Sequence, residues 1–168
     1  MTFLRKLEEE PWRFDYFAVL RFLERRHKDR PRIGDSSARR DEFVELGQDP
    51  FMDFPASNLA RAVQSDDKPV KVFLKFLGLL GPQGALPLAT TEEAHHYVIA
   101  RDDAFPRFLD LFNHRFIQLF FRAWADSRPI VQHDRPDLDR FVAYIGSAIG
   151  IGSPAFHNLD SVPDAAKL

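Results

Sequence analysis

The segment Phe105–Trp124, FPRFLDLFNHRFIQLFFRAW, decides the fold of this chain. Its apolar residues recur at steps of three and four, the period of a helix and not of a strand. They are Phe105, Phe108, Leu109, Phe112, Phe116, Leu119, Phe120 and Trp124. The opposite side carries Arg107, His114, Gln118 and Arg122. Because the apolar surface spans half the circumference or more, the pattern predicts about five helical turns that are covered from more than one direction.

The same pattern predicts which aromatic residues are buried. We expect the core seam of the helix to consist of Phe112, Phe116, Phe120 and Trp124. Leu111 and Phe121 lie off that seam, so they are the first candidates for an interface with a partner. Trp12 and Arg122 are secondary candidates, because interface hot spots favour aromatic residues and arginine.

The composition indicates a globular domain with an aromatic core. The chain has 168 residues, of which 45% are hydrophobic and 29% charged, and it contains 17 Phe. A net charge of −2 argues against a whole-domain electrostatic grip on nucleic acid or anionic lipid. The absence of cysteine excludes disulfides and thiolate metal sites. No apolar run reaches the length of a membrane span, and Met1–Glu10 lacks the apolar region of a secretory signal.

Shorter elements are predicted around the central helix. Helices are expected at 11–27, at 90–101 and from Asp134 to about Gly150, and strands at 42–46 and 69–77. Segment 57–64 fits either a short helix or a strand. The predicted fold class is α+β and helix-dominated, with a small antiparallel sheet or hairpin around one long aromatic-rich helix.

Motifs for phosphate binding and acyl transfer are weak. The turn at 78–87 holds three glycines and two prolines, but no Lys-Ser/Thr follows and no helix opens on it, so a shaped connector is the better interpretation. Ser147 lacks the Gly-x-Ser-x-Gly frame of a nucleophile elbow. The arginines between Arg25 and Arg40 favour a solvated linker over a nucleic-acid patch, because no aromatic residues interleave with them to stack bases.

One pattern is compatible with a metal site. Glu92 and His95 form Glu-x-x-His, a spacing that di-iron bundles use twice. Only one such locus exists here, and His114 would join it only through tertiary folding. A metal-dependent enzyme centred on these residues is therefore the alternative hypothesis. An assembly subunit remains the better interpretation, because the chain has more apolar helix surface than one small domain can cover.

Several stretches also resemble one known family. They are RIGDS at 32–36, VELGQDP at 44–50, FP at 54–55, FLGLLGPQGALP at 76–87, FLDLFNHR at 108–115 and LFFRAW at 119–124. In this order and spacing they are similar to TssG, also called ImpH or VasB, a baseplate component of the bacterial type VI secretion system. The resemblance runs from about Phe14 to the C-terminus.

The resemblance implies a structural role and no catalytic, cofactor-binding or metal-binding residues. TssG-like proteins join two copies of TssF in a wedge like that of contractile phage baseplates, contact TssK and TssE, and surround a central spike. Such a protein would be cytoplasmic, at the inner face of the inner membrane, without inserting into it and without binding nucleic acid. Family members are about twice this length, so we expect an N-terminal scaffold domain at 1–152 and the start of a missing half at 153–168.

Overall fold

The computed structural model describes residues 3–65, 68–157, 159–162 and 166. The chain forms two compact units, 1–123 and 124–168, and the boundary falls inside the long helix α4. The predicted division at residue 152 stays a prediction.

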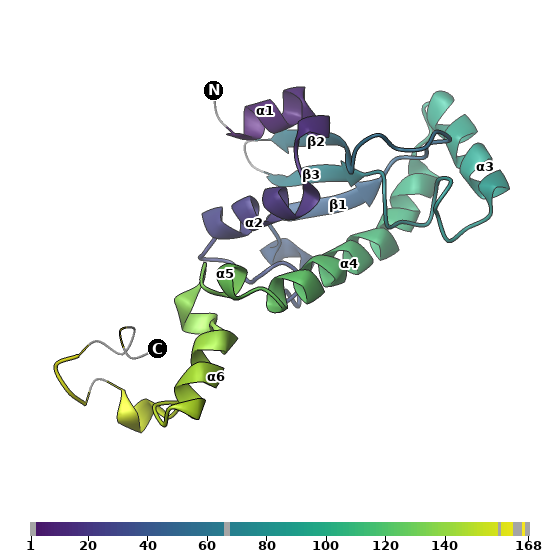
Figure 1. Cartoon of the computed structure of the whole chain (residues 1–168). Helices are drawn as coiled ribbons and strands as arrows, with labels where there is room; N and C mark the ends of the chain where they lie inside the picture. The colour runs from purple at the N-terminus through teal and green to yellow at the C-terminus, as the bar shows by residue number, and fades with distance from the viewer. Residues whose placement is uncertain (1–2, 66–67, 158, 163–165, 167–168) are drawn as a thin grey trace. The chain divides into compact units, whose positions relative to one another are not determined.

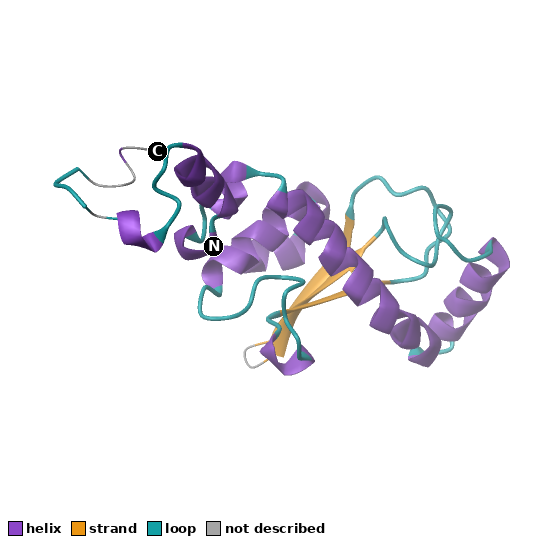
Figure 2. Ribbon diagram, turned by 90° about the horizontal axis from the view of Figure 1, so that it is seen from below, coloured by secondary structure: helices purple, strands orange, loops and turns teal. Residues whose placement is uncertain are grey.

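The first unit combines a small sheet with helices (Figures 1 and 2). Its main elements, in chain order, are α1 (Phe3–Glu9), α2 (Tyr16–Arg26), β1 (Val44–Gln48), β2 (Leu59–Ser65), β3 (Lys68–Leu74), α3 (Leu88–Ile99) and α4 (Ala104–Asp126). In Figure 1, α1 lies beside β2, and α4 runs beside β1 at the other edge of the sheet. The helix-dominated α+β class predicted from the sequence is confirmed.

The sheet is mixed, with strand order β1-β3-β2. β2 and β3 form an antiparallel hairpin, which agrees with the predicted one, and segment 57–64 is therefore mainly a strand. β1 pairs with β3 in parallel, in a register that places Val44 opposite Val70. This parallel pair was not predicted, because a long-range pairing partner leaves no signal in the periodicity of either strand.

Helix α2 buries one face in the core of the first unit. Asp15 caps it by accepting a hydrogen bond from the Ala18 N–H at 3.1 Å. Its buried face contains Tyr16, Val19, Leu20 and Leu23. The Tyr16 hydroxyl donates to the backbone carbonyl of Ile117 at 2.7 Å, so a buried polar group of α2 is satisfied by α4.

Helix α4 has the predicted extent and an unexpected orientation. Asp102 accepts from the Ala104 N–H at 3.0 Å, and the helix ends at Asp126, just before Arg128-Pro129. The expected core seam is wrong. Phe112, Phe116 and Phe120 are 48%, 57% and 41% exposed, while Trp124 is half-buried. The buried side of the helix contains Leu109, Ile117, Phe121 and Ala125 together with several polar residues.

The second unit begins in the last turn of α4 and contains α5 (Pro129–Gln132) and α6 (Arg140–Ala148). The single helix expected from Asp134 is divided, because Pro136 opens a separate 3₁₀ turn that ends at Leu138. Asp139 then caps α6 by accepting from the N–H groups of Phe141 and Val142. Within the described residues, no helix is both long enough and apolar enough to cross a membrane.

Candidate functional site

The polar side of α4 covers the free edge of the sheet. The Leu46 N–H of β1 donates to His114 Nδ1 at 3.0 Å, and the Gln48 N–H donates to Asp110 Oδ1 at 2.8 Å. Because His114 accepts at Nδ1, its proton is on Nε2, which donates to Glu42 Oε2 at 2.7 Å. Two edge donors of β1 are therefore satisfied by helix side chains in place of a fourth strand.

The spacing of the two elements makes this arrangement possible. Alternate N–H groups of a strand point to the same edge, about 6.6 Å apart, and residues four apart on a helix rise by about 6 Å. Gln118, one turn beyond His114, continues the series by donating to Glu42 Oε1 at 3.1 Å. Together with Asn113 and Arg122, these residues make the polar stripe of α4: Asp110, Asn113, His114, Gln118 and Arg122. An unpaired buried N–H costs about 1–3 kcal/mol, so a polar stripe is favoured here over an apolar one.

Two glycines allow close approaches around β1. A Cβ on Gly47 would lie 2.6 Å from Asp110 Oδ2, and a Cβ on Gly78 would collide with the Gln48 amide. The Gln48 side chain in turn holds the glycine-proline turn, donating to the Leu80 carbonyl at 2.7 Å and accepting from the Leu80 N–H at 2.9 Å. The turn at 78–87 is thus a shaped connector, and its backbone groups contact protein side chains.

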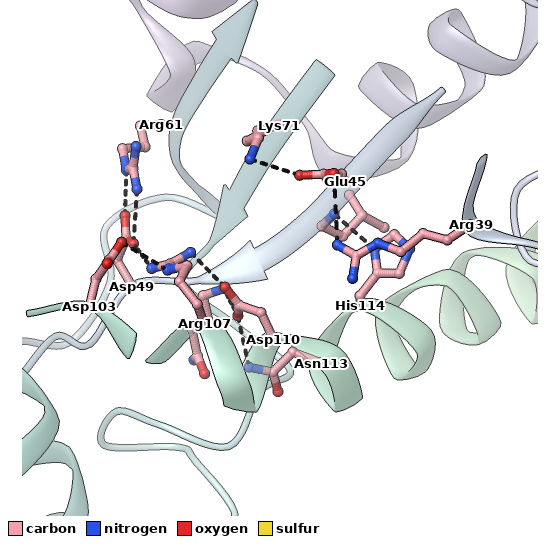
Figure 3. A network of polar contacts seen from close by, with 12 residues as sticks. Arg39, Glu45, Asp49, Arg61, Lys71, Asp103, Arg107, Asp110, Asn113 and His114 are labelled. Atoms are coloured by element: carbon pink, nitrogen blue, oxygen red, sulfur yellow. Dashed lines mark hydrogen bonds and ion pairs between the residues drawn. The ribbon is translucent and has the colours of Figure 1, made fainter. Parts of the chain in front are cut away.

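A charged network extends the polar stripe at the end of β1 (Figure 3). Arg107 donates to Asp49 Oδ1 at 2.7 Å and to Asp110 Oδ2 at 2.6 Å, and Arg61 also binds Asp49. The Arg61 and Arg107 guanidinium carbons lie 3.7 and 4.8 Å from the centre of the Phe73 ring. The cations of this network are therefore held by both carboxylates and an aromatic face.

The two aspartates of this network have opposite pKa shifts. Burial of Asp49 acts to raise its pKa, but the hydrogen bonds and charges of Arg61 and Arg107 outweigh burial and hold it below the ordinary value. For Asp110, burial is the dominant cause and raises the pKa, although the Gln48 N–H and Arg107 act in the other direction.

Two of the four predicted interface residues are buried within the first unit. Phe121 is fully buried, and Arg122 is 7% exposed and donates to Glu24 Oε1 at 3.2 Å. The sequence argument that placed Phe121 outside the core is thus wrong. Phe121 shares the buried side of α4 with the polar stripe, because that side faces the sheet edge and α2. Leu111 is 54% exposed and Trp12 is 60% exposed, so both side chains are accessible.

The outward side of α4 is mainly apolar, with Arg115 among its exposed residues. Its exposed residues form what we call the aromatic stripe: Phe108, Leu111, Phe112, Phe116, Leu119 and Phe120, each 41–57% exposed. Phe108 and Phe112 pack edge to face with ring centres 5.7 Å apart, and Phe120 contacts Tyr16 and Phe17 at the margin of the core. A half-exposed row of this length on one helix is the strongest candidate for a binding surface in the first unit.

The residues of the metal hypothesis are not brought together. Glu92 and His95 lie on α3, where the neighbouring Glu93 accepts from the Tyr97 hydroxyl at 3.0 Å and raises the Tyr97 pKa. His114 is bound to Leu46 and Glu42 at the sheet edge. Among the described residues, no group of three or more His, Asp or Glu side chains is arranged to hold a metal ion.

Sequence reasoning found the two sides of α4 but reversed their environments. A signal for the reversal was present: polar residues recur every four positions at 110, 114, 118 and 122, and β1 contains Gly47, which has no side chain to keep the helix away. A polar row that is continuous over three turns needs partners, and a strand edge supplies them.

Comparison with known proteins identifies a family. The family model described as "Type VI secretion, TssG" matches residues 10–168. Neither the curated proteins nor the solved structures gave a match.

Proposed function

This chain belongs to the TssG family of type VI secretion proteins, and from that membership we propose that it acts as a structural subunit of the baseplate wedge. In this role it connects copies of TssF, two in each wedge, and recruits TssK and TssE for assembly of the contractile sheath and tail tube. It works in the cytoplasm at the inner face of the bacterial inner membrane, around the central spike.

The observation that carries this proposal is the outward aromatic stripe of α4. The polar side of α4 makes contacts within the first unit, because Asp110, His114 and Arg122 all bind residues of other elements. The aromatic side chains of the stripe are left half-exposed. The polar side of α4 therefore stabilises the fold, and its aromatic side remains available for binding another protein, as a scaffold subunit requires.

The size of the stripe supports a protein partner. A buried aromatic side chain removes about 150–250 Å² from water, so six half-exposed large apolar residues present about 600 Å². This area is at the upper end of the range, about 300–600 Å², found for the largest apolar patch on a typical monomeric protein. It also approaches the roughly 800 Å² that each partner contributes to a standard interface. Covering it would gain a gross ~15 kcal/mol, from which the costs of association are subtracted.

Co-purification with TssF tests the proposal. The double variant Leu111→Glu/Phe116→Glu introduces two negative charges into the aromatic stripe, and glutamate is a good helix former, so α4 should be retained. The double variant should fold with the same circular dichroism as the unaltered chain and lose most of the TssF that co-purifies with it. Trp12→Glu tests the second exposed candidate in the same assay.

Phe54→Glu is the matched control, because Phe54 is an aromatic residue in a loop and is 80% exposed. We expect it to retain TssF fully. If the Leu111/Phe116 double variant retains as much TssF as this control, the aromatic stripe is not the binding surface and the proposal fails in this form.

A further inference from the structure

A groove on the first unit has four arginine or lysine side chains in its lining. It has a volume of about 450 Å³ and lies where the end of α2, the following loop, α1 and the start of β3 meet. The cations of its lining are Arg26, Arg30, Arg40 and Lys68, and Glu42 and Phe43 lie beside them. Arg26, Arg40 and Lys68 are exposed at this groove and come from three separate parts of the chain.

Among the described residues, the lining of the groove contains one acidic side chain, Glu42, which is hydrogen-bonded to side chains of α4. Glu42 accepts from His114 Nε2 at 2.7 Å and from Gln118 Nε2 at 3.1 Å. The Arg40 Nε lies 3.8 Å from Asp41, and the Arg40 side chain of that pair is 88% exposed. Such an exposed contact contributes little and is readily exchanged for a better partner. The groove therefore presents several cations and one carboxylate, which already accepts hydrogen bonds from other side chains.

The floor of the groove favours a peptide over nucleic acid. Single-stranded nucleic acid is held by aromatic faces on which bases stack. The ring in this floor, Phe43, is 5% exposed and is covered by the His27 imidazole, with ring centres 4.6 Å apart. Pro69 and Val70 add apolar contacts at the start of β3.

We propose that this basic groove binds an acidic peptide segment of a partner protein, rich in aspartate or glutamate. Arg26 and Arg40 offer planar guanidinium groups for bidentate carboxylate contacts, and Lys68 adds a point charge. The segment would bind independently of the aromatic stripe on α4. The chain would then have two kinds of contact with partner proteins. Binding at the groove is electrostatic and weakens as salt rises, whereas binding at the aromatic stripe is apolar and is not screened by salt.

The test uses the full chain and fluorescein-labelled decapeptides. One peptide alternates glutamate with glycine, a second has glutamine in place of glutamate, and a third probe is oligothymidylate with the same number of charges. We expect the glutamate peptide to bind, its affinity to fall as salt rises, and the glutamine peptide to bind at least tenfold more weakly. Oligothymidylate should bind less tightly than the glutamate peptide.

Substitutions locate the binding. Replacing Arg26, Arg40 and Lys68 by glutamine should weaken binding of the glutamate peptide at least tenfold. The matched control places glutamine at three cations that do not line the groove, namely Lys75, Arg101 and Arg128, and should bind as the unaltered chain does. Both triple variants are checked for unchanged circular dichroism.

Two results would each overturn the proposal: absence of binding to the glutamate peptide, or equal loss in both triple variants. Tighter binding of oligothymidylate that is lost in the groove variant would replace the peptide by nucleic acid as the ligand.

Discussion

His114 and Leu46 are separated by 68 positions in the chain, yet the imidazole Nδ1 of His114 accepts the backbone N–H of Leu46 at 3.0 Å. This bond joins α4 to the outer edge of β1. It also fixes the tautomer of His114, because Nδ1 cannot carry a proton while it accepts one.

The first prediction concerns this bond. His114→Phe keeps a ring of similar size but leaves the Leu46 N–H and the Glu42 carboxylate without the imidazole. We expect the free energy of unfolding to fall by about 2–3 kcal/mol, the cost of losing a buried bond and leaving its partner unsatisfied. Urea unfolding measures the change. His96→Phe, at an exposed position of α3, is the control and should change stability by less than about 0.5 kcal/mol.

The second prediction concerns Gly47. A methyl group there would lie 2.6 Å from Asp110 Oδ2, so Gly47→Ala should push α4 away from β1 and cost about 1–3 kcal/mol. Asp110→Ala removes the obstacle. The double variant should therefore be more stable than the sum of the two single changes predicts, and the double-mutant cycle should show a coupling of at least about 0.5 kcal/mol. Strict additivity would contradict the packing described.

The third prediction concerns the pH dependence of Asp49. Its pKa in the folded state lies below the ordinary value, because Arg61 and Arg107 outweigh burial. A lowered pKa contributes stability that is present above the unfolded pKa and is lost as the pH falls through the folded pKa. The stability difference between the unaltered chain and Asp49→Asn should therefore shrink in acid, below about pH 4. Urea unfolding of both proteins in buffers from about pH 2.5 to about pH 7 measures this difference in stability.

The fourth prediction gives the opposite sign for Asp110. Burial raises its pKa in the folded state, so its contribution to stability is fully present below the unfolded pKa and is lost as the pH rises through the folded pKa. Asp110→Asn keeps an oxygen that can accept the Gln48 N–H and removes the titration. The stability advantage of the unaltered chain over this variant should therefore grow as the pH is lowered from 7 towards 4. A constant difference over that range would contradict the raised pKa.

The fifth prediction compares two phenylalanines of α4. Phe121 is fully buried and Phe116 is 57% exposed. Phe121→Ala should cost about 3–5 kcal/mol, as deletion of a core aromatic does, whereas Phe116→Ala should cost less than about 1 kcal/mol. Thermal unfolding of the two variants measures the contrast. Equal losses would mean that the aromatic stripe belongs to the core after all.

Local features of the fold were predictable from the sequence. The period of three and four at 105–124 predicted α4, and alternation at 69–77 predicted β3, because each signal lies within the element itself. Short α1 and the parallel pairing of β1 were not, since seven residues carry little periodicity and a pairing partner lies far away in the sequence.

The sequence by itself determined that α4 is a helix with one aromatic side and one polar side, because side-chain periodicity follows from the geometry of the helix alone. Only the tertiary structure decided which side faces inward. Unsatisfied N–H groups at the edge of β1 required hydrogen-bond acceptors, and Gly47 let Asp110 and His114 come close enough to supply them. The polar side was buried for that reason, and the aromatic side was left at the surface.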